Sequence, residues 1–388
     1  MKNSMEKAEV TVIGGGLFGL SAAYYLAKEG VDVILVEKNE LASGATGSNN
    51  GMCGVYSATE PAELWHKIYE NLSEELQIDI EYKKSPDLVV YTPENVKEMK
   101  QIGIWEEISS KMVIGDELRE IEPLLAEDIV GGIESMGYII NPFKLCYAYA
   151  LGVKRCGSRV NINTIVTNIE VSNNRVKKVI TNKGDIETEF VVNAAGAWSS
   201  EIGNMVGIEI PIIPQKGDIL ITETAPKPDP YHGRIANSFF YASYPHNRRP
   251  EAVYSKDPMI RLGISAYIHY YPSTNNYGLG GSHENVGFER RVNPDTIYYI
   301  VKQCIRIVPS LKNLNVIRMH TGFRPYNYVD EKPILSKVED IKGFIISTGG
   351  GGSGIGLGPM SGKLISELII KDKTSIPLDA YSFSRFKK

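Results

Sequence analysis

Three glycines near the start of the chain have a spacing that suits the binding of a pyrophosphate. In Gly14-x-Gly16-x-x-Gly19, the first glycine permits a tight turn and the second lets a phosphate approach the backbone. The third lets a helix pack closely on a strand. Glu37, at the end of the next apolar run, is placed to accept hydrogen bonds from a ribose. Together these residues predict a dinucleotide site, but they do not distinguish FAD from NAD.

The elements expected around these residues complete a βαβ unit. An apolar run over Val10–Ile13 predicts a strand, and Leu17–Lys28 has a helical pattern that Gly30 ends. Val31–Val36 predicts a second buried strand that leads to Glu37. The helix N-terminus offers unpaired N–H groups and a partial positive charge to phosphates. The alternative, an ordinary glycine-rich turn, would not need the acid.

Three more segments are rich in small residues. Residues 41–51 (LASGATGSNNG) suit a backbone that lies against a flat ligand, although a flexible surface loop is the alternative. The strand expected to end at Val192 leads into NAAGAW, residues 193–198. Phe344–Thr348 predicts a strand, followed by a glycine turn at 349–356 and a helix over Pro359–Ile370. Too little chain follows for another βαβ unit, so this segment is expected to complete the first dinucleotide domain.

The rest of the chain alternates between helical and strand patterns. A hairpin turn is expected at 171–175, and the region 211–292, with an apolar run at 262–271, predicts a mostly antiparallel second domain. The expected helices are Ala62–Gln77, Glu94–Ile102, Pro142–Arg155 and Pro294–Val308, and the expected strands are Leu88–Tyr91, Thr164–Val171, Arg175–Thr181 and Ile186–Val192.

Composition excludes several classes of function. The 388 residues, 43% hydrophobic and 23% charged, predict an ordinary globular protein of two closely packed domains. A net charge of −4 gives no indication of nucleic-acid binding. Neither a membrane span nor a signal peptide is expected, and four cysteines without CxxC spacing predict neither disulfides nor a metal site. A cytoplasmic location is the default expectation.

The chain resembles the D-amino-acid oxidase/glycine oxidase superfamily of FAD-dependent amine oxidoreductases. The matching segments, in the order of the family, are GGGLFG with Glu37-Lys38, SGATGSNNG, NAAGAWS, TGFRP (321–325) and the terminal STGGGGSGIGLGPMSGKLISELI. Residues 214–218 (PQKGD) and 279–282 (LGGS) are most similar to the catalytic β subunits of proline, hydroxyproline, opine and sarcosine dehydrogenase complexes.

This resemblance implies an α/β fold. A Rossmann-like FAD-binding domain of the GR2 type would comprise residues 1–80, 142–212 and 318–388. A second, mostly antiparallel α+β substrate domain would comprise 81–141 and 213–317. FAD would be bound non-covalently, because the loop has Asn49 and Asn50 where members with attached flavin carry histidine.

The resemblance also implies which residues contact FAD. The glycine turn would hold the pyrophosphate, Glu37 the ribose, Val166 the adenine, and 350–355 the flavin pyrimidine. Many members carry arginine at the position of Ser48, which departs from the family pattern here. The complete set is Gly14, Gly16, Leu17, Phe18, Gly19, Glu37, Lys38, Gly44, Ala45, Thr46, Ser48, Asn49, Asn50, Gly51, Val166, Ala194, Ala195, Gly196, Trp198, Arg324, Gly350, Gly351, Gly352, Ser353, Gly354 and Ile355.

For the substrate, Arg324 is the candidate anchor of a carboxylate, with a structural ion pair as the alternative. His320, Tyr267 and Tyr326 are candidates for the pocket, although a core histidine and packing tyrosines are equally compatible with the pattern. Lys216 is expected in solvent or in a turn, and positive potential at the flavin is expected from the N-terminus of the Pro359 helix and from the glycine-turn amides before it.

The implied function is oxidation of the C–N bond of an amino acid or secondary amine by hydride transfer to flavin, with electrons passing to a partner subunit. Three alternatives remain open. They are an oxidase that makes peroxide, an enzyme that oxidises a hydroxyl substrate such as glycerol 3-phosphate or a 2-hydroxy acid, and a flavin-bearing structural subunit. A homo- or hetero-oligomer is expected.

Overall fold

The computed structural model describes residues 5–53, 65, 67–92, 110–228, 233–237 and 255–387. The chain forms two compact units, and two of the four boundaries between them fall inside strands. Unit 1 comprises Met1–Tyr82, Ile140–Pro214 and Arg324–Lys388. Unit 2 comprises Lys83–Ile139 and Gln215–Phe323. The sequence-based division into 1–80, 142–212 and 318–388 against 81–141 and 213–317 likewise describes one discontinuous body and a second one inserted into it.

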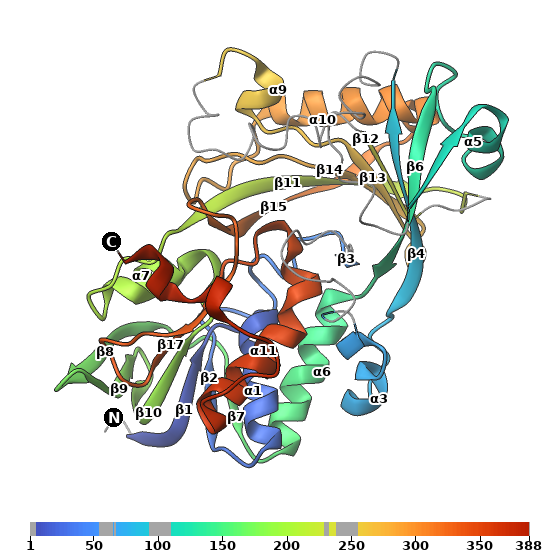
Figure 1. Cartoon of the computed structure of the whole chain (residues 1–388). Coiled ribbons are helices and arrows are strands. Elements are labelled where there is room, and N and C mark those ends of the chain that lie inside the picture. Colours follow the sequence, from blue (N-terminus) through green and yellow to red (C-terminus); the bar gives the residue numbers. More distant parts are fainter. Residues whose placement is uncertain are drawn as a thin grey trace. The chain divides into compact units, whose positions relative to one another are not determined.

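Unit 1 is built on a largely parallel sheet with the order β16-β17-β10-β1-β2-β7 (Figure 1). Five strands of this path are parallel to their neighbours, β16 is antiparallel to β17, and the hairpin β8–β9 pairs antiparallel beside β10. The strands are β1 (Glu6–Ile13), β2 (Val33–Val36), β7 (Arg159–Asn161), β8 (Val166–Ser172), β9 (Arg175–Thr181), β10 (Gly184–Asn193), β16 (Ile334–Lys337) and β17 (Phe344–Thr348).

Three helices lie side by side against this sheet (Figure 1): α1 (Leu17–Lys28), α6 (Pro142–Arg155) and α11 (Gly354–Lys371). Glycines of α11 allow α1 to approach closely, because a Cβ at Gly358 would collide with the side chain of Leu17. A Cβ at Gly362 would collide with Ser21. The Ser21 hydroxyl donates to the Gly358 carbonyl at 2.9 Å. Two segments that are 337 residues apart therefore form one helix pair.

Several elements match their predicted bounds. Helices α1 and α6 are confirmed residue for residue, and α10 (Pro294–Ile307) ends one residue earlier than predicted. In α6 and α10, an asparagine side chain caps the first turn and a proline follows it. Proline tolerates the first turn because its missing N–H would be unpaired there. The hairpin turn at Asn173 and Asn174 is also confirmed, with both residues at positive φ.

Other predicted bounds were wrong. In place of one helix at 62–77, the described part has a 3₁₀ turn η1 (Lys67–Tyr69) and a short helix α3 (Leu72–Leu76). Helix α11 begins at Gly354, not at Pro359. The apolar run 262–271, for which no element bounds were predicted, contains the strand β13 (Tyr267–Tyr271). The helix predicted at 94–102 lies outside the described residues.

Unit 2 contains a mixed sheet in which β15 (Val316–Asn327), β11 (Ile212–Thr224), β14 (Asn276–Gly280), β13, β12 (Arg234–Asn237), β4 (Lys83–Tyr91) and β6 (Gly131–Ile139) follow one another, with β5 (Ser110–Ile114) beside β6. Most of the recorded pairs are antiparallel, as predicted, but β12 runs parallel to β4. Helix α10 packs on β14 and contributes Ile300 and Cys304 to a core with Leu88 and Ile268. The α/β fold class is therefore confirmed.

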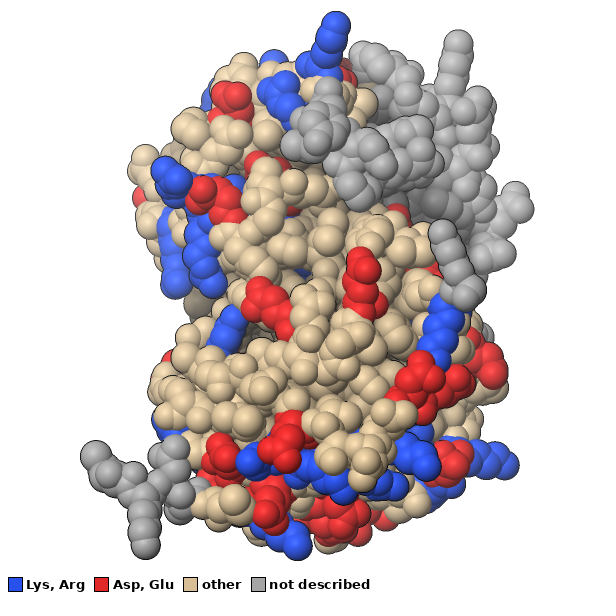
Figure 2. Space-filling model, turned by 90° about the vertical axis from the view of Figure 1, so that its left-hand side faces the viewer, with Lys and Arg blue, Asp and Glu red and all other residues tan. Residues whose placement is uncertain are grey.

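The surface carries both signs of charge. On the face drawn in Figure 2, the described basic and acidic side chains lie next to one another. Among the described residues, no helix combines the length and apolar character that crossing a bilayer requires.

Candidate cofactor-binding site

Four parallel strands of unit 1 end at one edge of the sheet. β1 ends at Ile13, β2 at Val36, β10 at Asn193 and β17 at Thr348. Ile13 is level with both Val36 and Asn193 in the strand register. In open α/β sheets, ligands bind in the crevice outside the carboxyl ends of the strands. The four segments that follow these ends are the segments that the sequence predicts to hold a dinucleotide.

The glycines of the first turn have different roles. Gly14 has φ +116°, and a Cβ there would collide with the Ala194 carbonyl oxygen. A Cβ at Gly19 would collide with the carbonyl of Gly14. At Gly16, the nearest atom to a Cβ would be Thr46 Oγ1 at 3.2 Å. Gly14 and Gly19 are thus required by packing inside the protein, whereas Gly16 keeps the backbone accessible at the start of α1.

Glu37 is buried, and its carboxylate forms a hydrogen bond to the backbone of the first glycine turn. Its Oε2 accepts from the Gly15 N–H at 2.6 Å, and its Oε1 accepts from the Asn39 N–H at 2.8 Å. A carboxylate has about four acceptor positions, so capacity for ribose hydroxyls remains. The segment that leads to Val166 lies beside this point, because the Thr164 N–H donates to the Glu37 carbonyl at 2.8 Å.

The loop that follows β2 folds back on the first turn of α1. Thr46 Oγ1 accepts from the Leu17 N–H at 3.1 Å, which satisfies one of the free donors of the helix. Asn49 Oδ1 accepts from the Gly51 N–H at 2.6 Å, and its amide also donates to the Ala45 carbonyl at 3.2 Å. Asn50 Oδ1 accepts from Met52 N–H at 3.2 Å. The predicted residues of this loop are therefore together, but both asparagine side chains bond within the loop.

The segment after β10 completes the same edge. The Ala194 N–H donates to the Ile13 carbonyl at 2.9 Å, and Thr348 Oγ1 donates to the Gly196 carbonyl at 3.1 Å. The Lys38 ammonium lies 3.3 Å from the centre of the Trp198 ring, a cation–π contact between two residues of the predicted set. The predicted set does not include Thr348 or Asn193, whose Oδ1 accepts from the Ala195 N–H at 3.3 Å, although a polar residue at the end of an apolar strand was the available signal.

The C-terminal glycine turn contributes a second helix N-terminus. Gly350 lies against Phe18, whose ring would be 3.0 Å from a Cβ there. Gly351–Ser353 form a 3₁₀ turn, and α11 begins at Gly354. The helix therefore starts five residues before the predicted Pro359, and its first N–H groups belong to Gly354–Leu357, within the turn whose amides were expected to contribute positive potential.

These residues fit FAD. Gly16 has no side chain that could cap α1, and within the described chain the Ser353 side chain forms no capping hydrogen bond to α11. Apart from the Leu17 N–H, which donates to Thr46, the first N–H groups and the positive dipole ends of both helices can therefore face a ligand. Around Gly196, Gly351 and Gly354, a Cβ would meet no described atom within 4 Å apart from the adjacent residues and the backbone of the same helix. Both helix ends suit negatively charged groups of a ligand, such as a pyrophosphate. The described residues hold no group of three or more His, Cys, Asp or Glu side chains arranged for a metal ion.

Two of the predicted substrate residues belong to unit 1. Arg324 and Tyr326 lie two residues apart on β15, so they point to the same side of the strand. Arg324 is half-buried, and the buried Tyr326 donates its hydroxyl to Glu331 at 3.0 Å.

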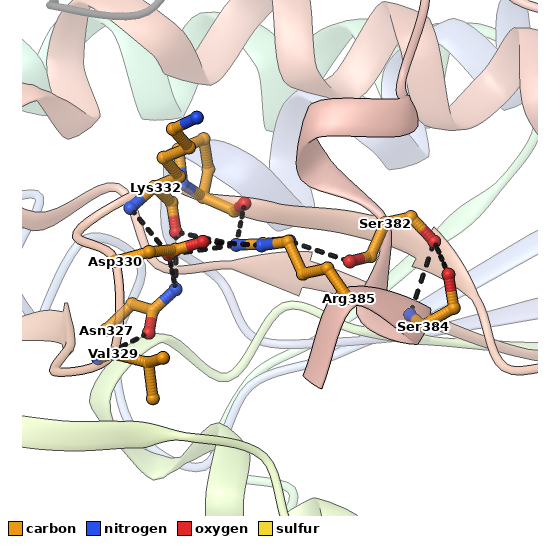
Figure 3. Close-up of polar contacts among 8 residues, drawn as sticks. Asn327, Val329, Asp330, Lys332, Ser382, Ser384 and Arg385 are labelled. Carbon is orange, nitrogen blue, oxygen red and sulfur yellow. Dashed lines mark hydrogen bonds and ion pairs between the residues drawn. The ribbon is translucent and has the colours of Figure 1, made fainter. Parts of the chain in front are cut away.

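A polar network holds the chain just after Arg324 (Figure 3). Arg385 pairs with Asp330 at 2.7 Å and donates to the Pro333 carbonyl at 3.1 Å. The Asn327 amide donates to Asp330 at 2.6 Å. The end of β15 is therefore fixed three residues beyond the guanidinium.

The other two predicted substrate residues, His320 and Tyr267, belong to unit 2. Burial, with Arg318 nearby, lowers the pKa of His320, so its ring is neutral at pH 7. Its Nε2 has no hydrogen-bond partner among the described residues. The Tyr267 ring lies over Gly280 and Gly281, where a Cβ at Gly280 would collide with it.

The expectation for Lys216 was wrong. Lys216 is buried in β11, where its ammonium donates to the Arg291 carbonyl at 2.7 Å. It also pairs with Asp218 at 3.4 Å and Glu284 at 3.6 Å. Two buried carboxylates offset the cost of burying this cation, and burial raises the pKa of Glu284.

Comparison with known proteins agrees with this geometry. Residues 9–368 match the family model described as FAD dependent oxidoreductase (DAO). Mitochondrial dimethylglycine dehydrogenase of Rattus norvegicus is 27% identical over 99% of this chain, which spans only 45% of that relative. The crystal structure of L-proline dehydrogenase from P. horikoshii has a TM-score of 0.84 and 27% identity, with 99% of this chain and 98% of that one covered. Glycine oxidase from Bacillus cereus ATCC 14579 has a TM-score of 0.79 and 27% identity, with 94% and 96% covered.

The matched region includes the glycine turn, the acid, the loop and the C-terminal helix that meet at the edge of the sheet. The chain therefore belongs to the DAO family of FAD-dependent oxidoreductases.

Proposed function

We propose that the protein uses FAD to oxidise the C–N bond of an amino acid or secondary amine of the proline, sarcosine or opine type. The observation that carries this proposal is the meeting of two glycine turns, each of which opens a helix, at the carboxyl edge of one parallel sheet. The substrate class is supported by the names of the similar proteins, which include enzymes of dimethylglycine, proline and glycine.

In this proposal, the N-terminal half of the edge holds the dinucleotide. The N–H groups at the start of α1 bind the pyrophosphate, and Gly16 admits it to the backbone. Glu37 accepts from the ribose while it keeps its bonds to Gly15 and Asn39. Because Thr46 occupies the Leu17 N–H, the phosphates take the remaining donors of the turn.

In this proposal, the backbone N–H groups at the C-terminal half of the edge stabilise the reduced flavin. Bound FAD supplies the hydride acceptor of the reaction. The first N–H groups of α11 and the amides of the turn before it stabilise negative charge at the pyrimidine end of the flavin. These groups are backbone donors that need no reorganisation during the reaction, so their stabilising effect is present before hydride transfer begins.

The substrate is held by Arg324 in this proposal. Its guanidinium forms a bidentate pair with the carboxylate and so orients the Cα–H bond. The substrate loses a hydride from carbon and a proton from nitrogen, which gives an imine that water hydrolyses. An amine that binds in its neutral form needs no protein base at carbon, so we assign no residue to that role. His320, Tyr267 and Tyr326 remain candidates for the pocket wall.

We propose non-covalent attachment of FAD. The loop offers Asn49 and Asn50, whose side chains bond to the backbone of the loop. Burial raises the pKa of the nearby Cys53 thiol to about 12, so it carries almost no thiolate at neutral pH. Acid precipitation should therefore release all yellow colour into the supernatant, whereas colour that stays in the pellet would contradict this assignment.

We propose a cytoplasmic dehydrogenase that passes electrons to a partner subunit, although the similar proteins include both dehydrogenases and an oxidase. The test is a panel of D- and L-amino acids, N-methyl amino acids and opines, scored by anaerobic bleaching of the flavin. Repetition in air with peroxide detection separates a dehydrogenase from an oxidase. Bleaching by 2-hydroxy acids or glycerol 3-phosphate alone would contradict the proposed substrate class, and no bleaching by any compound would favour a structural subunit.

A further inference from the structure

The first turn of α11 lacks one of its backbone hydrogen bonds. In an α-helix, the carbonyl of each residue accepts from the N–H four residues later. Four residues after Ile355 comes Pro359, which lies inside the helix and has no N–H. Ile355 is buried, with 7% of its surface exposed, so its carbonyl cannot depend on bulk water for a partner.

Tyr69 supplies the missing donor from a distant part of the chain. Its hydroxyl donates to the Ile355 carbonyl at 2.5 Å, across 286 residues of sequence. The Tyr69 ring is 1% exposed and stacks on Tyr82, with centroids 5.1 Å apart and planes 15° apart. Burial raises the pKa of Tyr69 well above its usual value, so the hydroxyl stays protonated and keeps donating at alkaline pH.

The bond lies between the fixed and the open parts of α11. On one side, Gly358 packs against Leu17 and accepts from Ser21. On the other side, a Cβ at Gly354 would meet no described atom within 4 Å apart from the adjacent residues and the backbone of its own helix. Ile355 is the second residue of the helix. Tyr69 therefore holds the one turn that separates the packed helix from the proposed flavin site.

We propose that Tyr69 is a positioning residue for the flavin, because it completes the hydrogen bond that Pro359 withholds and so fixes the N–H groups at the start of α11. The inference rests on the cofactor site proposed above. A first turn that is free to fray would present its N–H groups less firmly to the negative charge of the flavin. Removal of the hydroxyl should therefore weaken every interaction that depends on negative charge in the ring.

Sulfite is a suitable probe, since its addition to an oxidised flavin leaves negative charge on the pyrimidine ring. In FAD-loaded Tyr69→Phe, we expect roughly tenfold weaker sulfite binding, the effect of losing about one buried hydrogen bond. The midpoint potential should become more negative while FAD remains bound. Tyr149→Phe is the matched control, because it removes an equally buried hydroxyl from α6. A Tyr69→Phe protein that binds sulfite as tightly as the wild type would overturn the inference.

Replacement of Pro359 by alanine provides a second test. If Tyr69→Phe only lowered the stability of the protein, its effect on sulfite binding would be the same with proline or alanine at position 359. Pro359→Ala restores an N–H that can reach the Ile355 carbonyl. In this background, Tyr69→Phe should weaken sulfite binding by only about twofold, because the carbonyl keeps a donor. Equal losses in both backgrounds would exclude the proposed link between Tyr69 and Pro359.

The cofactor-free protein separates this inference from the proposed function. Hydrogen exchange at the amides of 354–358 should be faster in Tyr69→Phe than in the wild type, and it should slow again in the double variant. A wild-type protein that takes up no FAD would overturn the proposed function and this inference together. A wild-type protein that binds FAD and sulfite, but whose amide exchange is unaffected by Tyr69→Phe, would overturn the inference alone.

Discussion

Glu37 illustrates how one side chain can serve both the fold and a ligand. Its two oxygens each accept one backbone N–H, from Gly15 and from Asn39, and so fix the turn to the end of β2. The sequence predicts an acid at this point, but it gives no sign that the acid bonds to the protein itself. The predicted contact with ribose would add to these bonds, since a carboxylate can accept more than two.

Arg324 carries the residue-scale prediction about the substrate. Charge-assisted hydrogen bonds contribute about 1.5–3 kcal/mol each, so loss of a bidentate pair should raise KM by roughly one to three orders of magnitude. Arg324→Ala should nevertheless retain bound FAD, measured by its visible absorbance. Arg318→Ala, at an exposed position of the same strand, is the control and should leave KM within about twofold. An unchanged KM in Arg324→Ala would remove Arg324 from the pocket.

His269 gives a residue-scale prediction about acid stability. The ring is buried on β13, level with Arg234 on β12 and edge-on to Tyr271, 4.5 Å away. Burial, together with the Arg234 charge, lowers the pKa of His269 to about 3. Because an unfolded histidine titrates near 6.5, the unfolded state binds more protons between these values. Stability is therefore complete above about pH 6.5 and falls as the pH decreases toward 3.

His269→Leu should flatten this pH dependence. Between pH 7 and 4.5, the wild type should lose on the order of 2 kcal/mol more unfolding free energy than the variant. Urea unfolding at the two pH values measures the difference. If both proteins lose the same free energy, the acid sensitivity has another source.

At the scale of elements, predictions succeeded where local signals agreed. In α6, an asparagine cap, an initial proline and an apolar periodicity all indicate the same helix, and its bounds were correct. In α11, Pro359 was interpreted as a first-turn residue, yet it is the sixth residue of the helix. The Gly354–Gly358 segment has low helix propensity, and its packing against Leu17 outweighs that preference. The sequence alone does not contain this long-range contact.

An element-scale prediction follows from the first turn, in which Gly19 is required by packing, whereas Gly16 keeps the backbone accessible. Gly19→Ala should lower the stability of the cofactor-free protein by about 2 kcal/mol or more, because its Cβ would collide with the Gly14 carbonyl. Gly16→Ala should leave that stability nearly unchanged but weaken FAD binding at least tenfold, since its methyl group would occupy the approach of the phosphates. Denaturant unfolding and FAD titration separate the two effects. Equal destabilisation by both substitutions would refute the distinction.

For the whole molecule, the sequence correctly indicated that both glycine turns belong to one sheet. β17 pairs with β10, which pairs with β1, so the C-terminal turn completes the site that the N-terminal turn begins. Contacts such as Ser21 with Gly358 and Tyr69 with Ile355 could not be predicted, because hydrogen-bond partners depend on tertiary arrangement. The position of Arg324 relative to a bound substrate likewise stays a prediction.

A stoichiometry follows from this topology. We expect one FAD per chain, because the two turns share one edge and the described residues of unit 2 contain no second glycine turn at the end of a parallel strand. Absorbance of released flavin against protein concentration measures the ratio. A ratio near two would require another flavin site and would contradict this account of the fold.

The pairing of α1 with α11 has a consequence during synthesis. A ribosome that adds about 5–20 residues per second needs roughly 20–70 seconds to travel the 337 residues from Ser21 to Gly358. During this interval, the surface of Leu17 and Ser21 has no α11 to cover it, and the nascent βαβ unit exposes apolar area to water. Yellow colour should therefore be gained only after α11 has been synthesised and has docked against α1.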